Sequence, residues 1–277
     1  MVAIKKTVKN LLQFFGVKKV NQQENGELKT SLSDNDRYPN FCLNAANDLS
    51  VFKNFRQNGI YRQILEHVDV EAGERYLEEI LKTKPDLINE IDKIKENDLY
   101  GNPSLFKYKT VGEINPTTLR YTKVLADILN HVGNLHGLKI AEIGAGYGGQ
   151  CRIITALNQP EEYTLVDIKP ALLLAKRYLD GYTLSSVINY KTMDELKKES
   201  YDLVISNYAF TELRRDIQDV YLDKIILNSK NGYITYNEIT PEEFRSFKLD
   251  ELLKIIPNSK VMAEEPLTSE KNCIIFW

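Results

Sequence analysis

The chain contains few residues of the kinds that form disulfide frameworks and zinc sites. Its three cysteines, Cys42, Cys151 and Cys273, lie far apart and share no metal-type spacing. This argues against both a disulfide scaffold and a zinc site, and a reducing cytoplasm is the expected location. The histidines His67, His131 and His136 are equally scattered. None adjoins a motif in the sequence, so none is singled out as catalytic.

Long apolar runs and an excess of positive charge are also missing. No run approaches the roughly 20 apolar residues that span a bilayer, so no transmembrane segment is expected. The formal net charge of -3 gives no basic field for nucleic acid. With 43% hydrophobic and 27% charged residues, the composition is that of a globular protein with a sizeable core.

The first 20 residues combine five lysines with an apolar stripe formed by Val8, Leu11, Leu12 and Phe15. Such an amphipathic helix either contacts a membrane surface or docks on the protein or on a second subunit. We expect docking, and with it a possible route to a homo-oligomer. The apolar block is too short for a secretory signal.

The most informative stretch is KIAEIGAGYGGQ at residues 139–150, followed by YTLVDIKP at residues 163–170. It predicts a strand, a glycine turn, a helix and a second strand that ends on Asp167. Gly144, Gly146 and Gly149 permit positive φ and leave room for a ligand against the backbone. Asp167 is placed to accept hydrogen bonds from the two ribose hydroxyls of an adenosine.

Two cofactors fit this spacing, because the three glycines also satisfy the dinucleotide fingerprint G-x-G-x-x-G. Glu142 separates the two interpretations. A carboxylate beside the turn would repel a pyrophosphate but attract the sulfonium and ammonium groups of S-adenosylmethionine. The sequence therefore favours S-adenosylmethionine over NAD.

From about residue 138 onward, strand-like and helix-like segments alternate, which predicts a mostly parallel sheet covered by helices on both faces. Expected strands are KIAEI, YTLVD, SSVINY, YDLVISN and GYITYNE; expected helices cover about 148–157, 171–178, 194–198 and 216–227, with another from Pro241. The last two strands, KVMAEE and NCIIFW, are joined by a linker too short for a crossover helix, so they must be antiparallel. A parallel sheet closed by such a hairpin is the seven-stranded, Rossmann-like architecture of class I methyltransferases.

The preceding part of the chain has a different pattern. Helical periodicity in YRQILEHV, GERYLEEILKT and PDLINEIDKIKE predicts a helical extension over residues 1–110. It would act as a lid, an oligomer contact or a substrate-selecting element. Residues 111–277 would form the cofactor-binding domain, which a helix starting at Asn115 and Pro116 would introduce.

Four segments carry a more specific resemblance: PTTLRY at 116–121, EIGAGYGGQ at 142–150, SNYAFTEL at 206–213 and the terminal NCIIFW. In these segments the chain resembles the bacterial sugar O-methyltransferases, a branch of the class I S-adenosylmethionine-dependent enzymes. The resemblance covers roughly residues 100–277. It implies transfer of a methyl group to a hydroxyl of a sugar or sugar-containing acceptor, such as a nucleotide-linked or glycan precursor.

The same resemblance assigns cofactor residues. The loop from Gly144 to Gly149 would wrap the methionine part, Asp167 would hold the ribose, and Thr192 and Met193 would lie beside the adenine. Met193 would equally suit the core, and Tyr147 would either face the ligand or cover the loop as a structural residue. The full predicted cofactor set is Glu142, Gly144, Ala145, Gly146, Tyr147, Gly149, Gln150, Asp167, Ile168, Thr192, Met193, Asn207 and Tyr208.

Methyl transfer to a hydroxyl needs an aligned oxygen and a base that removes its proton. Glu212, which follows the fourth strand, is the leading base, although a carboxylate there would also suit a helix start. Asn237 and Glu238 are second choices and predicted acceptor-binding residues. Arg120 and Tyr121 would close over the cofactor carboxylate, bind a charged sugar nucleotide or form a structural ion pair.

Three alternatives remain at this point. One is a methyltransferase for another small-molecule or phosphorylated acceptor, another is an NAD-dependent oxidoreductase, and the third is a scaffold without turnover. Asp194, Glu212, Asp216 and Glu238 would offer oxygen ligands to Mg²⁺, but no spacing requires a metal and none is predicted.

Overall fold

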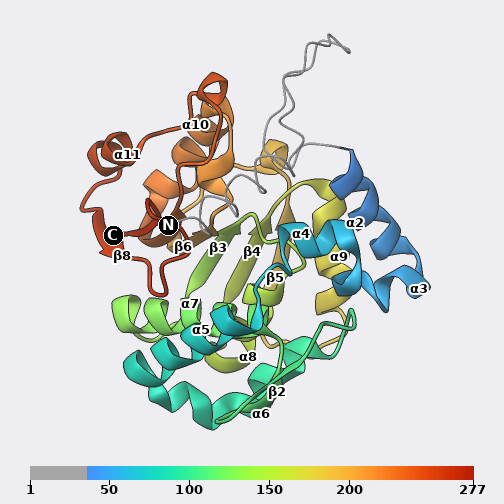
Figure 1. Ribbon diagram of the computed structural model, residues 1–277. Helices are drawn as coiled ribbons and strands as arrows, with labels where there is room; N and C mark the ends of the chain where they lie inside the picture. The colour runs from blue at the N-terminus through green and yellow to red at the C-terminus, as the bar shows by residue number, and fades with distance from the viewer. Residues whose placement is uncertain (1–35) are drawn as a thin grey trace.

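The strands expected after residue 138 form one seven-stranded sheet in the computed structural model, which describes residues 36–277 (Figure 1). The sheet order is β5-β4-β3-β6-β7-β9-β8. Its strands are β3 (Lys139–Ile143), β4 (Glu162–Val166), β5 (Val187–Lys191), β6 (Tyr201–Asn207), β7 (Ser229–Tyr236), β8 (Lys260–Ala263) and β9 (Cys273–Phe276). Neighbours from β5 to β7 are parallel, whereas β9 pairs antiparallel with both β7 and β8. The predicted fold class is confirmed.

Helices cover both faces of this sheet, so its central strands are buried on two sides and read as apolar runs. One face packs on α7 (Pro116–Val132), α8 (Gly149–Asn158) and α9 (Lys169–Leu179), and the other on α10 (Arg215–Lys224) and α11 (Leu249–Ile255). Neighbouring residues of β3 illustrate this, since Ile140 belongs to the first core and Ala141 to the second. Helix α7 begins where predicted: Asn115 accepts a hydrogen bond from the Thr117 N–H at 2.8 Å.

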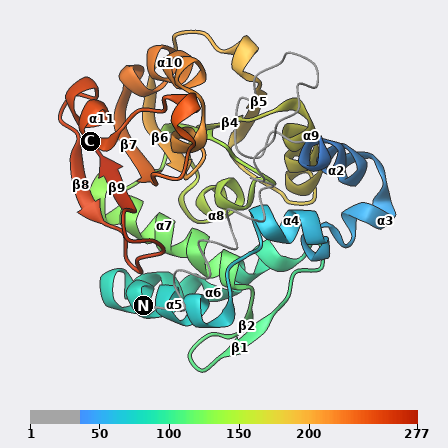
Figure 2. The same ribbon diagram turned by 45° about the horizontal axis from the view of Figure 1, so that its top comes forward.

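The described part of the predicted N-terminal extension is helical and packs on the sheet's helices. It contains α2 (Arg37–Asn47), α3 (Leu49–Phe52), η1 (Phe55–Gln57), α4 (Gly59–Ile64), α5 (Val70–Thr83), η2 (Pro85–Glu90), α6 (Ile91–Lys95) and η3 (Glu96–Asp98). Helix α2 lies against α9, and α5 lies against α7 (Figure 2). Their apolar residues belong to the same core cluster as those of α7, α8 and α9.

A buried arginine fixes this extension to the start of α7. Arg56 is 1% exposed and donates from Nε to Glu66 at 2.7 Å. Its two Nη atoms donate to Asp98 and to the helix-capping Asn115, each at 3.1 Å. One guanidinium therefore joins three segments of the chain, and two buried carboxylates compensate its charge.

Several local expectations were wrong. The segment from Pro85 is a 3-10 helix followed by the short α6 rather than one continuous helix. Pro241 precedes a single 3-10 turn, η7 (Glu242–Phe244), and the α-helix starts only at Leu249. The antiparallel pair β1 (Phe106–Tyr108) and β2 (Gly112–Ile114) was not predicted. The expected amphipathic stripe from Val8 to Phe15 lies outside the described residues. No helix within residues 36–277 has the length and apolar content that a bilayer crossing requires.

Candidate active site

The glycine turn between β3 and α8 has positive φ values at three glycines, as the sequence predicts, but the third of them is Gly148 rather than Gly149. Positive φ values occur at Gly144 (77°), Gly146 (55°) and Gly148 (85°), whereas Gly149 is the first residue of α8. Gly149 is required for a different reason, because a Cβ there would lie 2.6 Å from Cε2 of Tyr121. At Gly144 a Cβ would lie 2.0 Å from the Cβ of Ala209. The turn is thus held closely between α7 and the end of β6.

Asp167 directly follows β4, and its carboxylate forms hydrogen bonds with backbone N–H groups of the turn and of its own segment. One carboxylate oxygen accepts from the Gly146 N–H at 2.9 Å and the other from the Ile168 N–H at 2.7 Å. Burial raises the pKa of Asp167 to about 6. The neighbouring Ile168 is 44% exposed, so an acid and an apolar surface lie together at the carboxyl edge of the sheet.

Glu142 is less available to a ligand than its position in the sequence suggests. Its side chain is buried and accepts a hydrogen bond from the Tyr163 hydroxyl at 2.8 Å. Burial raises the pKa of Glu142 to about 8, so the carboxyl group is protonated near neutral pH. The electrostatic argument from Glu142 for a cationic cofactor is weakened accordingly.

Thr192 and Met193 follow β5, the parallel neighbour of β4, and so lie at the same edge as Asp167. Thr192 caps η4 (Met193–Glu195) through hydrogen bonds from its N–H and hydroxyl to Glu195, at 2.7 and 3.0 Å. Met193 is half-buried and packs against the core beside α10. Their contact with an adenine stays a prediction.

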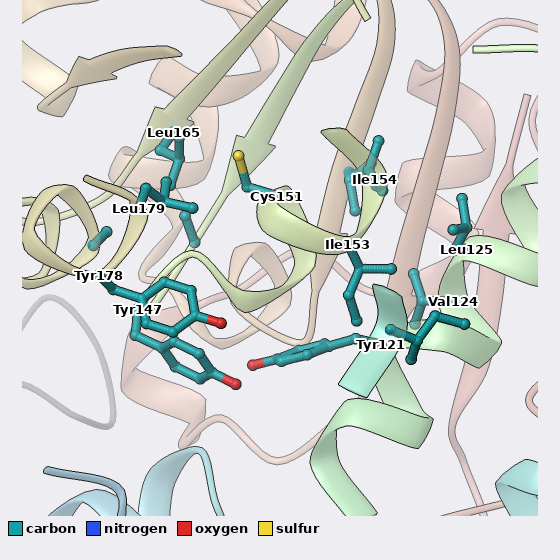
Figure 3. Packing of buried hydrophobic residues seen from close by; sticks show 14 of the residues in the cluster. Tyr121, Val124, Leu125, Tyr147, Cys151, Ile153, Ile154, Leu165, Tyr178 and Leu179 are labelled. Atoms are coloured by element: carbon teal, nitrogen blue, oxygen red, sulfur yellow. The ribbon is translucent and has the colours of Figure 1, made fainter. Parts of the chain in front are cut away.

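Of the two roles expected for Tyr147, the structure shows the structural one, and its side chain does not face a ligand. Its ring is fully buried and packs against Phe55 and Tyr61. Tyr121 and Tyr178 lie on either side of it (Figure 3). Gln150 and Ala145 are also buried, and the Gln150 amide donates to the Tyr121 carbonyl at 3.1 Å. These three side chains support the turn from within the core, so a cofactor contact would come only from the backbone at these positions.

The predicted base and one of its second choices lie together. Glu212, in η5 (Phe210–Glu212), accepts a hydrogen bond from the Asn237 amide at 2.6 Å, and the Thr211 hydroxyl donates to Asn237 at 2.9 Å. Burial raises the pKa of Glu212 to about 7. The partner of Glu212 is thus a side chain after β7 rather than the backbone of α10, and its pKa suits a general base near neutral pH.

Glu238 has a different environment. Its carboxylate pairs with Lys248 at 3.0 Å and with Lys271 at 2.5 Å, and these hydrogen bonds lower its pKa. Two lysines already compensate its charge. A role in acceptor binding stays a prediction for this residue, with no contact that favours it.

A narrow cavity lies between α7, the ends of β6 and β7, and the segment after β8. Four predicted residues help to line it: Arg120, Tyr121, Asn207 and Tyr208. The remaining lining residues were missed from the sequence and are Tyr76, Lys123, Val124, Asp127, Tyr233, Thr235, Glu264, Glu265 and Ile274. Charged residues inside the otherwise apolar helix segment YTKVLADIL were the one available signal for Lys123 and Asp127.

Two polar networks form the walls of this cavity. Asp127 accepts from Lys123 at 2.8 Å and from the Tyr233 hydroxyl at 2.9 Å. Tyr208, a non-glycine residue at φ 66°, donates its hydroxyl to the buried Glu264. Among residues 36–277, no group of three or more histidine, cysteine or acidic side chains is arranged to hold a metal ion.

Comparison with known proteins finds a family match that includes part of this site. Residues 141–226 match the family model described as "Methyltransferase domain". The chain carries a methyltransferase domain. The match begins in β3 and extends beyond α10, so it includes the glycine turn, Asp167 and Glu212. The predictions of a methyltransferase and of its S-adenosylmethionine cofactor are confirmed at the level of this domain.

Individual relatives and solved structures have low sequence identity to this chain. The chain is 28% identical over 121 residues to the non-reducing polyketide synthase ausA of Penicillium brasilianum, and 26% identical over 160 residues to mapC of Penicillium roqueforti. These matches cover 40% and 53% of this chain but only 4% and 6% of the synthases.

Among solved structures, the chain resembles magnesium protoporphyrin IX methyltransferase from Synechocystis, with 12% identity, a TM-score of 0.44 and coverage of 76% of this chain and 97% of that one. It also resembles the B. subtilis tRNA methyltransferase TrmK, with 16% identity, a TM-score of 0.39 and coverage of 55% and 63%. At these identities the likeness concerns the fold alone.

Proposed function

We propose that the protein is an S-adenosylmethionine-dependent O-methyltransferase whose acceptor is a hydroxyl of a sugar or sugar-containing molecule. The acid and the exposed apolar side chain that lie together beside the turn, Asp167 and Ile168, support this cofactor. In this proposal the turn binds the methionine part, Asp167 binds the ribose, and Ile168 and Met193 pack on the adenine.

The chemistry of the side chains that line the cavity is the observation that supports the acceptor class. The cavity itself has a volume of about 20 Å³, so a sugar would enter only after these side chains move apart. Four tyrosines, Asn207, Thr235 and two glutamates line it, together with Arg120, Lys123 and Asp127, and its aliphatic members are Val124 and Ile274. A sugar presents hydroxyls that pair with amide and carboxylate oxygens, and C–H faces that pack on aromatic rings.

Glu212 and Asn237 do not line this cavity; the Thr211 hydroxyl, which lies 2.9 Å from the Asn237 amide oxygen and 3.1 Å from the Tyr208 carbonyl, connects them to its wall. The bound cofactor would supply the methyl carbon. The protein has to hold an acceptor oxygen in line with that carbon and remove the hydroxyl proton. Glu212 would accept the proton, and Asn237 would orient its carboxylate through the 2.6 Å hydrogen bond. Because the pKa of Glu212 is about 7, its deprotonated form is available near neutral pH.

The test is an acceptor screen with methyl-labelled S-adenosylmethionine. Free sugars, sugar phosphates and nucleotide sugars form one panel, and phenols, amines and carboxylic acids of similar size form the other. The proposal expects label on a sugar hydroxyl and its loss in Glu212→Gln. Labelling confined to a nitrogen or to a non-sugar acceptor would overturn the acceptor class and leave the cofactor assignment intact.

A further inference from the structure

Arg120 occupies a position in the cavity that its protein contacts do not explain. It extends from α7, is half-buried and lines the cavity together with Tyr76 and Tyr208. Its Nη2 donates to the Leu65 carbonyl at 3.4 Å, near the limit for a hydrogen bond. The guanidinium also lies 5.5 Å from the centre of the Tyr121 ring. The side chain also forms a hydrogen bond with Tyr121. A guanidinium has five N–H donors, so within residues 36–277 these contacts leave most of them free for a ligand.

The other cations at this end of α7 are compensated by acids. Arg56 pairs with Glu66 at 2.7 Å and with Asp98 at 3.1 Å, and Lys123 pairs with Asp127 at 2.8 Å. For Arg120, no carboxylate in residues 36–277 lies within 4.0 Å. A structural ion pair, one of the roles expected from the sequence, is therefore absent from the described chain.

Two candidate acids are already engaged with other partners. Glu66 is the partner of Arg56. Glu264, on the same cavity wall, accepts from the Tyr208 hydroxyl and from the backbone and hydroxyl of Thr268, at 2.8 and 2.7 Å. A partly desolvated guanidinium without an acid is costly unless a ligand supplies the opposite charge.

We propose that Arg120 forms an anion subsite that binds a carboxylate or phosphate group of the ligand in this cavity. The planar guanidinium fork matches both groups, which can accept two parallel hydrogen bonds from it. This inference rests on the proposed function and narrows it. The anion is either the α-carboxylate of the cofactor or an acidic group of the acceptor, such as a sugar phosphate.

Calorimetric titration distinguishes the two sources. S-adenosylhomocysteine and 5′-methylthioadenosine share the adenosine and the thioether, but only the former has a carboxylate. If Arg120 binds the cofactor, Arg120→Gln weakens S-adenosylhomocysteine roughly tenfold to a hundredfold and leaves 5′-methylthioadenosine unchanged. If it binds the acceptor, both nucleosides bind as before, and inorganic phosphate, titrated with and without S-adenosylhomocysteine, binds the wild type but not the variant.

Arg62→Gln is the matched control, because Arg62 is an exposed arginine on α4 and should change none of these affinities. Arg120→Lys keeps the charge without the fork, and an intermediate loss is expected. It also serves if Arg120→Gln fails to fold. The inference is overturned if Arg120→Gln binds S-adenosylhomocysteine and phosphate as the wild type does. Failure of the wild type to bind S-adenosylhomocysteine would instead contradict the proposed function, and the phosphate titration without it would still test the subsite.

Discussion

Glu212 accepts a hydrogen bond of 2.6 Å from Asn237, and this contact joins the end of β6 to the end of β7. The two residues are 25 positions apart in the chain. They meet because the carboxyl ends of neighbouring parallel strands share one edge of the sheet. Burial raises the pKa of Glu212 to about 7, which gives this carboxyl group the properties of a base near neutral pH.

Replacing Glu212 by Gln should separate catalysis from binding. The amide keeps the size of the side chain but cannot accept a proton, so kcat should fall roughly 10²- to 10⁴-fold, while the affinity for S-adenosylhomocysteine is unchanged. In the wild type, the rate should rise with pH up to about 7, because only the deprotonated carboxylate acts as a base. The measurement is the pH dependence of kcat/KM for both proteins. A variant that retains the wild-type rate and pH profile would remove Glu212 from the mechanism.

Added methyl groups in the glycine turn should destabilise the protein according to the space available. Gly144→Ala combines a positive φ with a Cβ 2.0 Å from that of Ala209, and Gly149→Ala brings a Cβ to 2.6 Å from the Tyr121 ring. Each should reduce the free energy of unfolding by about 1–3 kcal/mol and weaken cofactor binding. Thermal unfolding and S-adenosylhomocysteine titration measure the two effects.

Gly59→Ala is the control for these variants, because a Cβ at Gly59 meets nothing within 4 Å and the residue lies at the start of α4. Its stability should equal or slightly exceed that of the wild type. Equal stability of all three variants would mean that the turn is not packed as described.

Arg56 should be necessary for the stability of the whole folded unit. Arg56→Ala would leave the carboxylates of Glu66 and Asp98 without their cation in a buried site, at a cost of about 3–5 kcal/mol. We expect one cooperative unfolding transition at lower temperature, because the N-terminal helices and the sheet helices share a core. Calorimetric unfolding tests this. Two separate transitions would instead identify the extension as an independent domain.

The buried Glu142 should make stability depend on pH. Burial raises its pKa from 4.5 to about 8, so the folded protein retains this proton in a range where the unfolded chain has lost it. Stability should therefore fall as pH rises from about 4.5 to 8, by at most roughly 1.4 kcal/mol per pH unit from this group. In Glu142→Gln this contribution disappears. Urea unfolding across that pH range compares the two, and parallel pH dependences would contradict a raised pKa.

Much of the fold could be predicted from the sequence because its strands are buried on both faces. Parallel strands covered on two sides read as apolar runs, and the predicted bounds of β3 and β6 match the structure. The terminal hairpin followed from linker length alone. By contrast, the β1–β2 pair has three residues per strand, and four of the six are exposed or partly exposed, so such strands have no clear apolar pattern.

The candidate site was only partly predictable. Positions defined by local backbone, such as Gly144 and Asp167, were identified from the glycine motif. The choice between the two roles of Tyr147 could not be made from the sequence, because Phe55 and Tyr61, about 90 residues earlier, bury its ring. Tyr76 and Glu264 were missed for the same reason: tertiary packing alone brings α5 and the segment after β8 to the cavity.

The most direct test of the central claim is calorimetric titration with S-adenosylhomocysteine and, in parallel, with NAD, for the wild type and for Asp167→Ala. The account predicts micromolar binding of S-adenosylhomocysteine by the wild type, a large loss of that binding in Asp167→Ala, and no binding of NAD. Binding of NAD, or of S-adenosylhomocysteine with equal affinity in the absence of the Asp167 carboxylate, would contradict the proposed cofactor site.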